Sequence, residues 1–376
     1  MSLLAYILPA FFVLLYVLFM HRTRKAWQRI ETFATEKNYQ PLHFVSVLIP
    51  FRNELNNLPS LIKDLTAQDF PKVKCEFIFI NDHSDDGSEK ILETLLHQFR
   101  HAQLISLKDK TGKKAALQTG LEVSKGEVIV TVDADVRLKN HWLTTITAFH
   151  HLQEPALSIL PVSMQEERTY WKQLIRLEWM SLMALTGGSA ERHKALMCNG
   201  ANLAMERAAF LHIGGFTSYQ HISSGDDMFT LINMKKLGPN SVKYLWNHEA
   251  IAQVKAPSTF FTYISQRIRW ASKTSKAKDI HILSAGLILL FGNLAMMSSV
   301  ALSFYIAQHW LLTLFLFGIK LTVEFSLLQA TAKKFEEKIL ERDAMLLSII
   351  YPVYMLIIPL IGLFYRPKWK GRTIQA

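Results

Sequence analysis

The segment that most constrains this chain is residues 130–136, which read Val-Thr-Val-Asp-Ala-Asp-Val. Val and Thr favour a strand of the kind that is buried on both faces in a parallel sheet. Such a strand ends at the carboxyl edge of the sheet, where open α/β folds bind their ligands. Asp133 and Asp135 point the same way along a strand, so both can face one divalent cation. The segment therefore predicts a site for Mg²⁺ or Mn²⁺ and a diphosphate.

The region from residue 44 onward alternates between short apolar runs and longer amphipathic runs. Strands that alternate with helices are joined by right-handed crossovers and form a mainly parallel sheet. The expected fold class is therefore α/β. The expected strands are 44–49, 75–80, 103–107 and 127–132, and the expected helices are 54–68, 85–99 and 113–124.

Long apolar runs lie at both ends of the chain, and half of all residues are hydrophobic. The run Leu3 to Met20 has no charged residue and spans roughly 27 Å as a helix, enough to cross a bilayer core. A later run, 345–365, contains Pro352 and Pro359, which we expect to interrupt it, so it either spans the membrane or is re-entrant or interfacial. The expected domains are a transmembrane helix at 1–21, a cytoplasmic catalytic domain at 40–280, and a membrane domain of two or three segments at 281–366.

The positive charges next to the apolar runs predict the orientation of the chain. In the first run the charges follow the apolar core at residues 21–25, unlike a signal peptide, and place the following block in the cytoplasm. The formal net charge is +11, and its cations cluster beside membrane segments. Anionic lipid is therefore the expected partner, and nucleic acid is not. The two cysteines, Cys75 and Cys198, suggest no disulfide framework.

Polar clusters follow the expected strands at the ligand edge. Pro50 to Glu54 follows the first strand, and Asn81 to Ser88 follows the second. The second cluster can read a base or a ribose, whereas the alternative is that Ser84 or Asp85 only caps a helix. Lys113 stands at the start of a helix and can reach a phosphate, or it can be a solvated surface residue.

Two further clusters carry charge in the second half of the chain. Residues 223–227 end in Asp226 and Asp227 at a helix start, where an acid either favours the helix dipole or serves as a general base. Residues 266–270 read Gln-Arg-Ile-Arg-Trp, and Gln266, Arg269 and Trp270 share one helix face. The alternative for this second cluster is an ordinary basic-aromatic belt beside a membrane helix.

Together these strings resemble the inverting family-2 nucleotide-sugar glycosyltransferases over about residues 44–280. The matching strings are the I-P-x-x-N-E loop, the D-x-S-x-D loop, the Gly-Lys loop, the D-x-D, N-G-A-N at 199–202, G-G-F at 214–216, the acidic pair, and Q-x-x-R-W. The last string and the membrane helices look most like cellulose, chitin and hyaluronan synthases and their smaller relatives. The resemblance implies a GT-A-type, Rossmann-like sheet domain flanked by transmembrane helices.

The resemblance also implies roles for individual residues. Pro50, Glu54, Asp82, Asp85, Lys113 and Asp133 would bind the nucleotide sugar, with Asp82 at the base. Asp135 would hold the metal, Mg²⁺ or Mn²⁺. Asp227 would be the general base, beside Asp226. Gln266, Arg269 and Trp270 would bracket the diphosphate and the acceptor end.

The chain departs from the family at Arg52, where Tyr is frequent, and at Gln118, where Asn is frequent. Because Arg52 borders the base pocket, both UDP- and GDP-sugars remain candidate donors. Polymer synthases usually have more membrane helices, so we expect a metal-dependent transfer to a lipid or lipid-linked glycan at the cytoplasmic face of a bacterial plasma membrane. The alternatives are a processive polysaccharide synthase subunit and a catalytically silent assembly partner.

Overall fold

The computed structural model of the chain describes residues 3–165, 169–219, 225–274, 278–365, 368–369 and 372–373. The chain folds into two compact units. The sheet unit comprises Glu31–Gln165, Met197–Lys255 and Lys368–Ala376. The helical unit comprises Met1–Ile30, Glu166–Leu196 and Ala256–Pro367. The described residues 169–196, 256–274 and 278–280 thus belong to the helical unit, and the expected catalytic domain at 40–280 stays a prediction.

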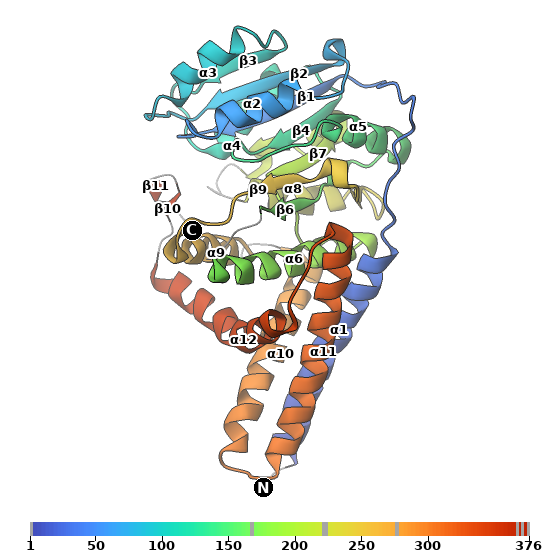
Figure 1. Cartoon of the computed structure of the whole chain (residues 1–376), viewed down its shortest axis with the longest axis vertical. Coiled ribbons are helices and arrows are strands. Elements are labelled where there is room, and N and C mark those ends of the chain that lie inside the picture. The colour runs from blue at the N-terminus through green and yellow to red at the C-terminus, as the bar shows by residue number, and fades with distance from the viewer. Residues whose placement is uncertain are drawn as a thin grey trace. The chain divides into compact units, whose positions relative to one another are not determined.

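The sheet unit is an α/β structure around one seven-stranded sheet, in the strand order β3-β2-β1-β4-β7-β5-β8 (Figure 1). Strands β3, β2, β1 and β4 are parallel, β7 is antiparallel to both of its neighbours, and β5 pairs β8 in parallel. The main elements of this unit are β1 (Val45–Phe51), α2 (Leu58–Thr66), β2 (Cys75–Asn81), α3 (Ser88–Leu96), β3 (Ala102–Ser106), α4 (Lys113–Val123), β4 (Val128–Val132), α5 (Trp142–Gln153), β5 (Leu157–Ile159), β6 (Val162–Met164), β7 (Asn202–Glu206), α7 (Arg207–His212), α8 (Asp226–Lys235), β8 (Val242–Tyr244), β9 (Ala252–Val254), β10 (Lys368–Trp369) and β11 (Arg372–Thr373).

The first half of this unit confirms the sequence-based expectation. All four expected strands and all three expected helices form, with boundaries that shift by a few residues. The expected strand through 130–136 ends early, because β4 stops at Val132 and the D-x-D lies in the turn that follows. In that turn Ala134 and Val136 are buried while Asp133 and Asp135 are partly exposed, so the two carboxylates still lie on the same side of the backbone.

Strand β1 is the centre of the core, since all seven of its residues are buried. Val45, Val47 and Ile49 pack in one apolar cluster with residues of α2 and α5. Leu48 points to the opposite face, against α4. Burial of both faces explains the unbroken apolar run, which a half-exposed strand would not need.

The helical unit consists of six helices, among the residues described. Helices α1, α10 and α11 run side by side, and α12 lies at an angle against α10 and α11 (Figure 1). Their bounds are α1 (Leu4–Arg29), α6 (Tyr170–Glu191), α9 (Phe260–Thr274), α10 (Ile280–Ser303), α11 (His309–Phe335) and α12 (Glu341–Phe364).

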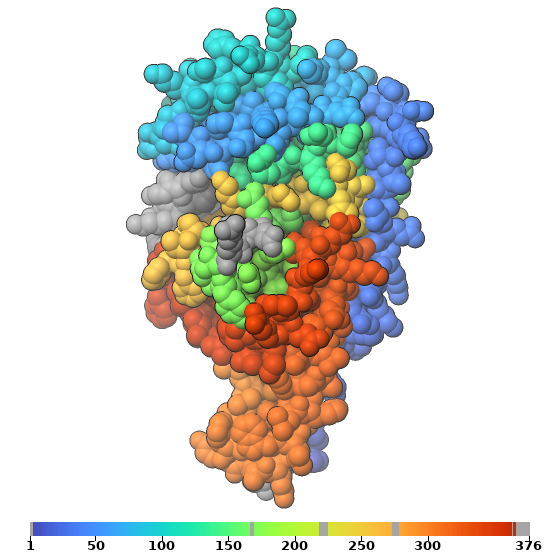
Figure 2. Space-filling view, in the orientation of Figure 1, coloured from blue at the N-terminus to red at the C-terminus, as the bar shows by residue number. Residues whose placement is uncertain are grey.

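Helices α1, α10, α11 and α12 are long and apolar enough to cross a membrane. Helix α12 continues through Pro352 and Pro359, so the expected interruption there is wrong. Large apolar side chains of α10 and α11 face outward, in the orange part of Figure 2. Exposed apolar surface of this extent on adjacent long helices is typical of contact with lipid. Examples are Leu287, Phe291, Leu311, Leu314 and Phe315.

Helix α6 crosses α1 closely because two glycines lie at the contact. A Cβ on Gly187 would come within 2.5 Å of the Trp27 ring, and a Cβ on Gly188 within 2.7 Å of the Thr23 carbonyl. Real Cβ atoms do not approach this closely, so the pair sets the distance between the helices. The C-terminal end of α6 is thereby held against α1, which matters for the pocket described below.

Candidate active site

A charged cluster forms in the sheet unit around Lys113, the first residue of α4. The Lys113 ammonium donates a hydrogen bond to Asp133 Oδ1 at 2.5 Å and lies 3.9 Å from Asp226 Oδ2. Lys113 Nζ also contacts the Gly200 carbonyl at 3.4 Å. Residues from α4, from the turn after β4 and from the start of α8 therefore meet at one place.

Carboxylates outnumber cations in this cluster. Burial lowers the pKa of Lys113, but Asp133 and Asp226 outweigh it and raise that pKa above its usual value. Burial raises the pKa of Asp133, the Lys113 ammonium opposes this, and Asp135 adds to the rise. The Lys113 ammonium thus interacts with the carboxylates of Asp133, Asp226 and Asp227. A bound cation would reduce the repulsion between these carboxylates.

Gly200 lies at the centre of the cluster. A Cβ at this position would lie 3.3 Å from both Lys113 Nζ and Asp226 Oδ2, and 3.4 Å from Asp227 Cβ. Its backbone N–H points to Asp227 Oδ2 at 3.4 Å, while Asp227 Oδ1 accepts the Met228 N–H at 2.8 Å. A Cβ would crowd these groups, so they would have to shift by a few tenths of an ångström to admit a side chain. Asp227 is in this way oriented by backbone donors on both of its oxygens.

The turn that contains Asp135 is held in place by interactions of the residues that follow it, Arg137 and Leu138. Arg137 forms a two-armed ion pair with the buried Asp64, with Nε to Oδ2 at 2.6 Å and Nη2 to Oδ1 at 2.8 Å. The Leu138 N–H donates to Asp64 Oδ2 at 3.0 Å. A bidentate pair of this kind is geometrically specific. It holds the turn two residues after Asp135, so the carboxylate is positioned without being itself engaged by the pair.

The two polar loops after β1 and β2 bind each other. Asn53 and Asp85 exchange two hydrogen bonds, from Nδ2 to Oδ1 at 2.8 Å and from the Asp85 N–H to Asn53 Oδ1 at 3.0 Å. The Glu54 N–H donates to Ser88 Oγ at 2.7 Å. Glu54 itself is buried and accepts from Asn57 at 2.6 Å. The polar residues of these loops therefore fix the loop pair against each other.

Asp82 connects this loop pair to the lysine. Its carboxylate is 1% exposed and accepts the Gly112 N–H at 3.0 Å, directly before Lys113. It also contacts His83 Nδ1 at 3.2 Å. Pro50 is buried within β1. The nucleotide-binding roles of Pro50, Glu54, Asp82 and Asp85 remain predictions, but the structure adds a second task for Asp82, which is to hold the start of α4.

Gln266, Arg269 and Trp270 lie on α9 in the helical unit, and all three are partly buried.

Arg267 is a residue that the sequence analysis did not single out. Its side chain is 5% exposed and pairs with the buried Glu178 of α6, with Arg267 Nη2 to Glu178 Oε2 at 2.7 Å. Its guanidinium lies 4.3 Å from the centre of the Trp270 ring, and Tyr263 donates to the same Glu178 at 2.7 Å. The spacing of Tyr263 and Arg267, four residues apart on one helix face, was the available signal.

We expect Glu178→Gln to destabilise the helical unit by about 3–5 kcal/mol, because it leaves the buried Arg267 charge without its counter-ion. A thermal unfolding midpoint of the full chain in detergent measures this. Glu191→Gln changes an exposed carboxylate on the same helix and serves as the control. Equal midpoints for the two variants would contradict the stabilising role of the pair.

The N-G-A-N segment at residues 199–202 contains one residue of the charged cluster and one residue that stabilises the fold. Gly200 belongs to the charged cluster, whereas Asn202 is fully buried and holds the fold together. Its amide donates to the Pro161 and Ala250 carbonyls and accepts from Trp142 Nε1 at 3.1 Å. Ser223 and Ser224 of the acidic cluster lie outside the described residues.

Comparison with known proteins shows which family and which fold this chain resembles. Residues 46–214 match the family model "Glycosyl transferase family 2". A mannosyltransferase from Pyrobaculum calidifontis, solved with GDP-mannose and Mn²⁺, superposes with a TM-score of 0.59 at 19% identity, over 88% of this chain and 98% of that chain. The chain thus has a GT-A-like fold. Residues 46–214 are thus similar to the family-2 glycosyltransferases.

Two curated relatives resemble shorter stretches. The glycosyltransferase AglE of Haloferax volcanii is 31% identical over 102 residues, which are 27% of this chain and 34% of the relative. The undecaprenyl-phosphate 4-deoxy-4-formamido-L-arabinose transferase of Pseudomonas fluorescens is 33% identical over 99 residues, 26% of this chain and 29% of the relative. The chain spans between 34% and 57% of the length of the first three relatives that it matches.

Proposed function

We propose that this protein is a metal-dependent, inverting glycosyltransferase that moves a sugar from a UDP- or GDP-sugar to a membrane lipid or lipid-linked glycan. The observation that carries the proposal is the cluster of Lys113, Asp133, Asp226 and Asp227 around Gly200. It combines a cation for a phosphate, acids for a sugar or metal, and an oriented carboxylate, in a family-2 domain.

Asp227 is the proposed general base. Backbone N–H groups hold both of its oxygens, so the carboxylate keeps one orientation while it takes the proton of the acceptor hydroxyl. The hydroxyl oxygen then attacks the anomeric carbon, the bond from that carbon to the diphosphate oxygen breaks, and the nucleoside diphosphate leaves. Attack from the face opposite the leaving group inverts the anomeric configuration. Lys113 offsets negative charge on the departing diphosphate.

The donor atoms present fit a divalent cation. Among the described residues no group of three or more His, Cys, Asp and Glu side chains forms a ready-made metal site. Mg²⁺ and Mn²⁺ do not need one, because one or two carboxylates plus substrate phosphates suffice for such ions. Asp135, with Asp133 beside it, would hold the ion in an acid-rich cluster that has one lysine to balance it. When bound, the ion would supply charge stabilisation for the diphosphate.

The helical unit supports a membrane location for the reaction. We propose that α1, α10 and α11 cross the membrane and that α6, α9 and α12 lie along its surface, since α12 runs at an angle to α10 and α11 (Figure 1). Three crossings put the C-terminus on the same side as residue 31. That agrees with the positive-inside rule, because basic residues occupy the C-terminal part of α1 and follow α12. The proposed side is the cytoplasm.

The lipid acceptor gives a testable product. Membranes that contain the protein should transfer label from a nucleotide sugar to a product that partitions into organic solvent, because a hydroxyl or phosphate at the headgroup layer needs no extraction from the bilayer. A screen of UDP- and GDP-sugars that reads nucleoside diphosphate release identifies the donor first. Asp227→Asn membranes provide the background.

Three outcomes separate the alternatives. Label in the organic phase supports the lipid acceptor. Label only in a long water-soluble polymer would favour the processive synthase instead. No turnover of any donor with Mg²⁺ or Mn²⁺ would favour the silent assembly partner, and against this stands the retention of Asp135, Asp226 and Asp227.

A further inference from the structure

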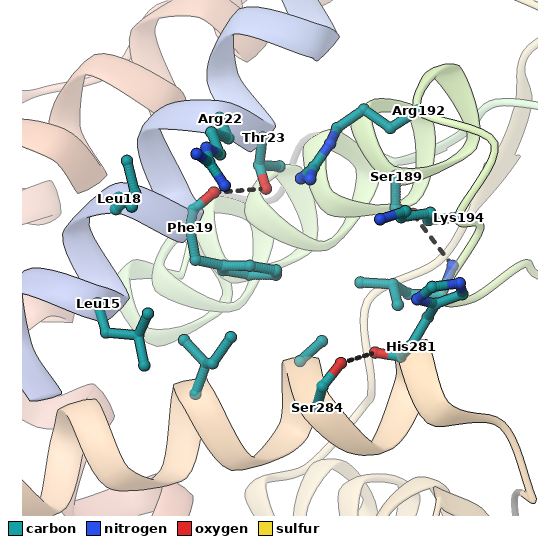
Figure 3. Close-up of a pocket in the computed structure, with 13 residues that line it drawn as sticks. Leu15, Leu18, Phe19, Arg22, Thr23, Ser189, Arg192, Lys194, His281 and Ser284 are labelled. Carbon is teal, nitrogen blue, oxygen red and sulfur yellow. Dashed lines mark hydrogen bonds between the residues drawn. The ribbon is translucent and has the colours of Figure 1, made fainter.

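A cavity of about 170 Å³ lies within the helical unit, between α1, the C-terminal end of α6 and the N-terminal end of α10 (Figure 3). This volume is several times the ~30 Å³ that one water takes up in the liquid. The close approach of α6 to α1 at Gly187 and Gly188 fixes one wall. The cavity belongs to no part of the sheet unit, so the proposed transfer reaction does not account for it.

One side of the cavity is cationic. Arg22 of α1, Arg192 and Lys194 after α6, and His281 of α10 line it, and their nitrogen-bearing side chains are drawn in Figure 3. No aspartate or glutamate is among the lining residues. Among the described residues, no carboxylate forms an ion pair with Arg22, Arg192 or Lys194. Burial and the like charge of Arg22 lower the pKa of Arg192, so an anion here would relieve a repulsion.

The other side is apolar. Leu15, Leu18 and Phe19 of α1 face Ala285 and Ile288 of α10 across the cavity. The division follows the sequence of the helices, because the charge-free stretch of α1 ends at Met20 and its basic stretch begins immediately afterwards. Such a change from apolar to basic residues marks the boundary between acyl chains and headgroups. The cavity therefore combines cationic and apolar lining residues, as a lipid with a charged headgroup would need.

We propose that this cavity is a binding site for a membrane lipid with a phosphate headgroup. Arg22, Arg192 and Lys194 bind the phosphate oxygens, for which guanidinium groups are well suited. The lipid chain lies against Leu15, Leu18 and Ile288. The proposal goes beyond the transfer reaction, since the bound lipid need not be the acceptor.

Binding to the full chain in a neutral detergent, measured by native mass spectrometry without any donor, tests the site. The probes are dioleoyl phosphatidic acid, dioleoyl phosphatidylglycerol, dioleoylglycerol and inorganic phosphate. The first two differ in headgroup, the third has the chains without phosphate, and the fourth has phosphate without chains. The double variant Arg22→Gln/Arg192→Gln is compared with Lys25→Gln/Arg29→Gln, which removes the same charge from exposed positions of α1 outside the cavity.

We expect one or both phosphate lipids to bind tightly and the Arg22→Gln/Arg192→Gln variant to bind them at least about tenfold more weakly, at roughly 1 kcal/mol per basic residue. The Lys25→Gln/Arg29→Gln variant and Arg22→Lys should retain binding. Equal affinity of the two double variants would overturn the site. Equal binding of dioleoylglycerol would overturn phosphate recognition, and displacement by an equal concentration of inorganic phosphate would overturn a lipid as the ligand. Unfolding midpoints without lipid establish that each variant is folded.

Discussion

Asp135→Ala should lower the turnover of the sugar transfer by about a thousandfold or more. Metal stabilisation of a leaving diphosphate is worth several kcal/mol, and each ~1.4 kcal/mol is a factor of ten in rate. The Asp64–Arg137 pair holds the adjacent backbone, so the loss should reflect the missing carboxylate and not a displaced turn. Nucleoside diphosphate release from the identified donor measures the rate.

Asp69→Ala is the control for this variant, because it removes a carboxylate that is largely exposed and lies on the loop after α2. Excess EDTA should reduce the wild-type rate to a similar extent, and added Mn²⁺ should restore it. Full activity in excess EDTA would contradict the proposed metal dependence, whatever the effect of Asp135→Ala.

Asp227→Asn should abolish transfer and leave donor binding close to that of the wild type. The change preserves the shape of the side chain and an oxygen that accepts the Met228 N–H, but it removes the basicity that takes the acceptor proton. Calorimetric titration with the donor and a turnover assay separate the two effects, because a residue that acts only in the chemical step changes the rate and not the affinity.

Asp226→Asn is the matched comparison, since it makes the same chemical change one residue away. Asp226 lies 3.9 Å from Lys113, so its loss should chiefly alter the charge around that lysine and weaken the donor affinity. An active Asp227→Asn beside an inactive Asp226→Asn would reverse the assignment of the base.

Local sequence patterns predicted the first half of the sheet unit well. Strand β1 and its neighbours are buried on both faces, and such strands leave unbroken apolar runs that are easy to recognise. The second half was harder, because β5, β6, β8 and β9 have three residues each and the antiparallel β7 joins β4 to β5. Three residues carry too little periodicity to distinguish a strand from a loop.

For the candidate site, the sequence indicated individual residues but not most of the contacts between them. The sequence singled out Lys113 and Asp133 as separate candidates, because each lies near the end of an expected strand, and the structure joins them by a hydrogen bond. The sequence could not predict that Asp82 fixes the backbone before Lys113, or that Asn53 and Asp85 bind each other. The register of β1 against β2 brings Asn53 to Asp85, and the pairing of β2 with β3 brings Asp82 to Gly112, over sequence separations of 32 and 30 residues.

By itself, then, the sequence determined which residues could carry the chemistry and which runs could enter a membrane, because residue type and periodicity are local properties. The tertiary structure decided which of those residues meet. It paired Arg267, not Arg269, with Glu178, and it carried α12 unbroken through two prolines and across its neighbours. It also gathered Arg22, Arg192 and Lys194 around one cavity. These basic residues come from separate parts of the chain, and only the packing of α1 against α6 and α10 brings them together. Local sequence patterns do not contain that information.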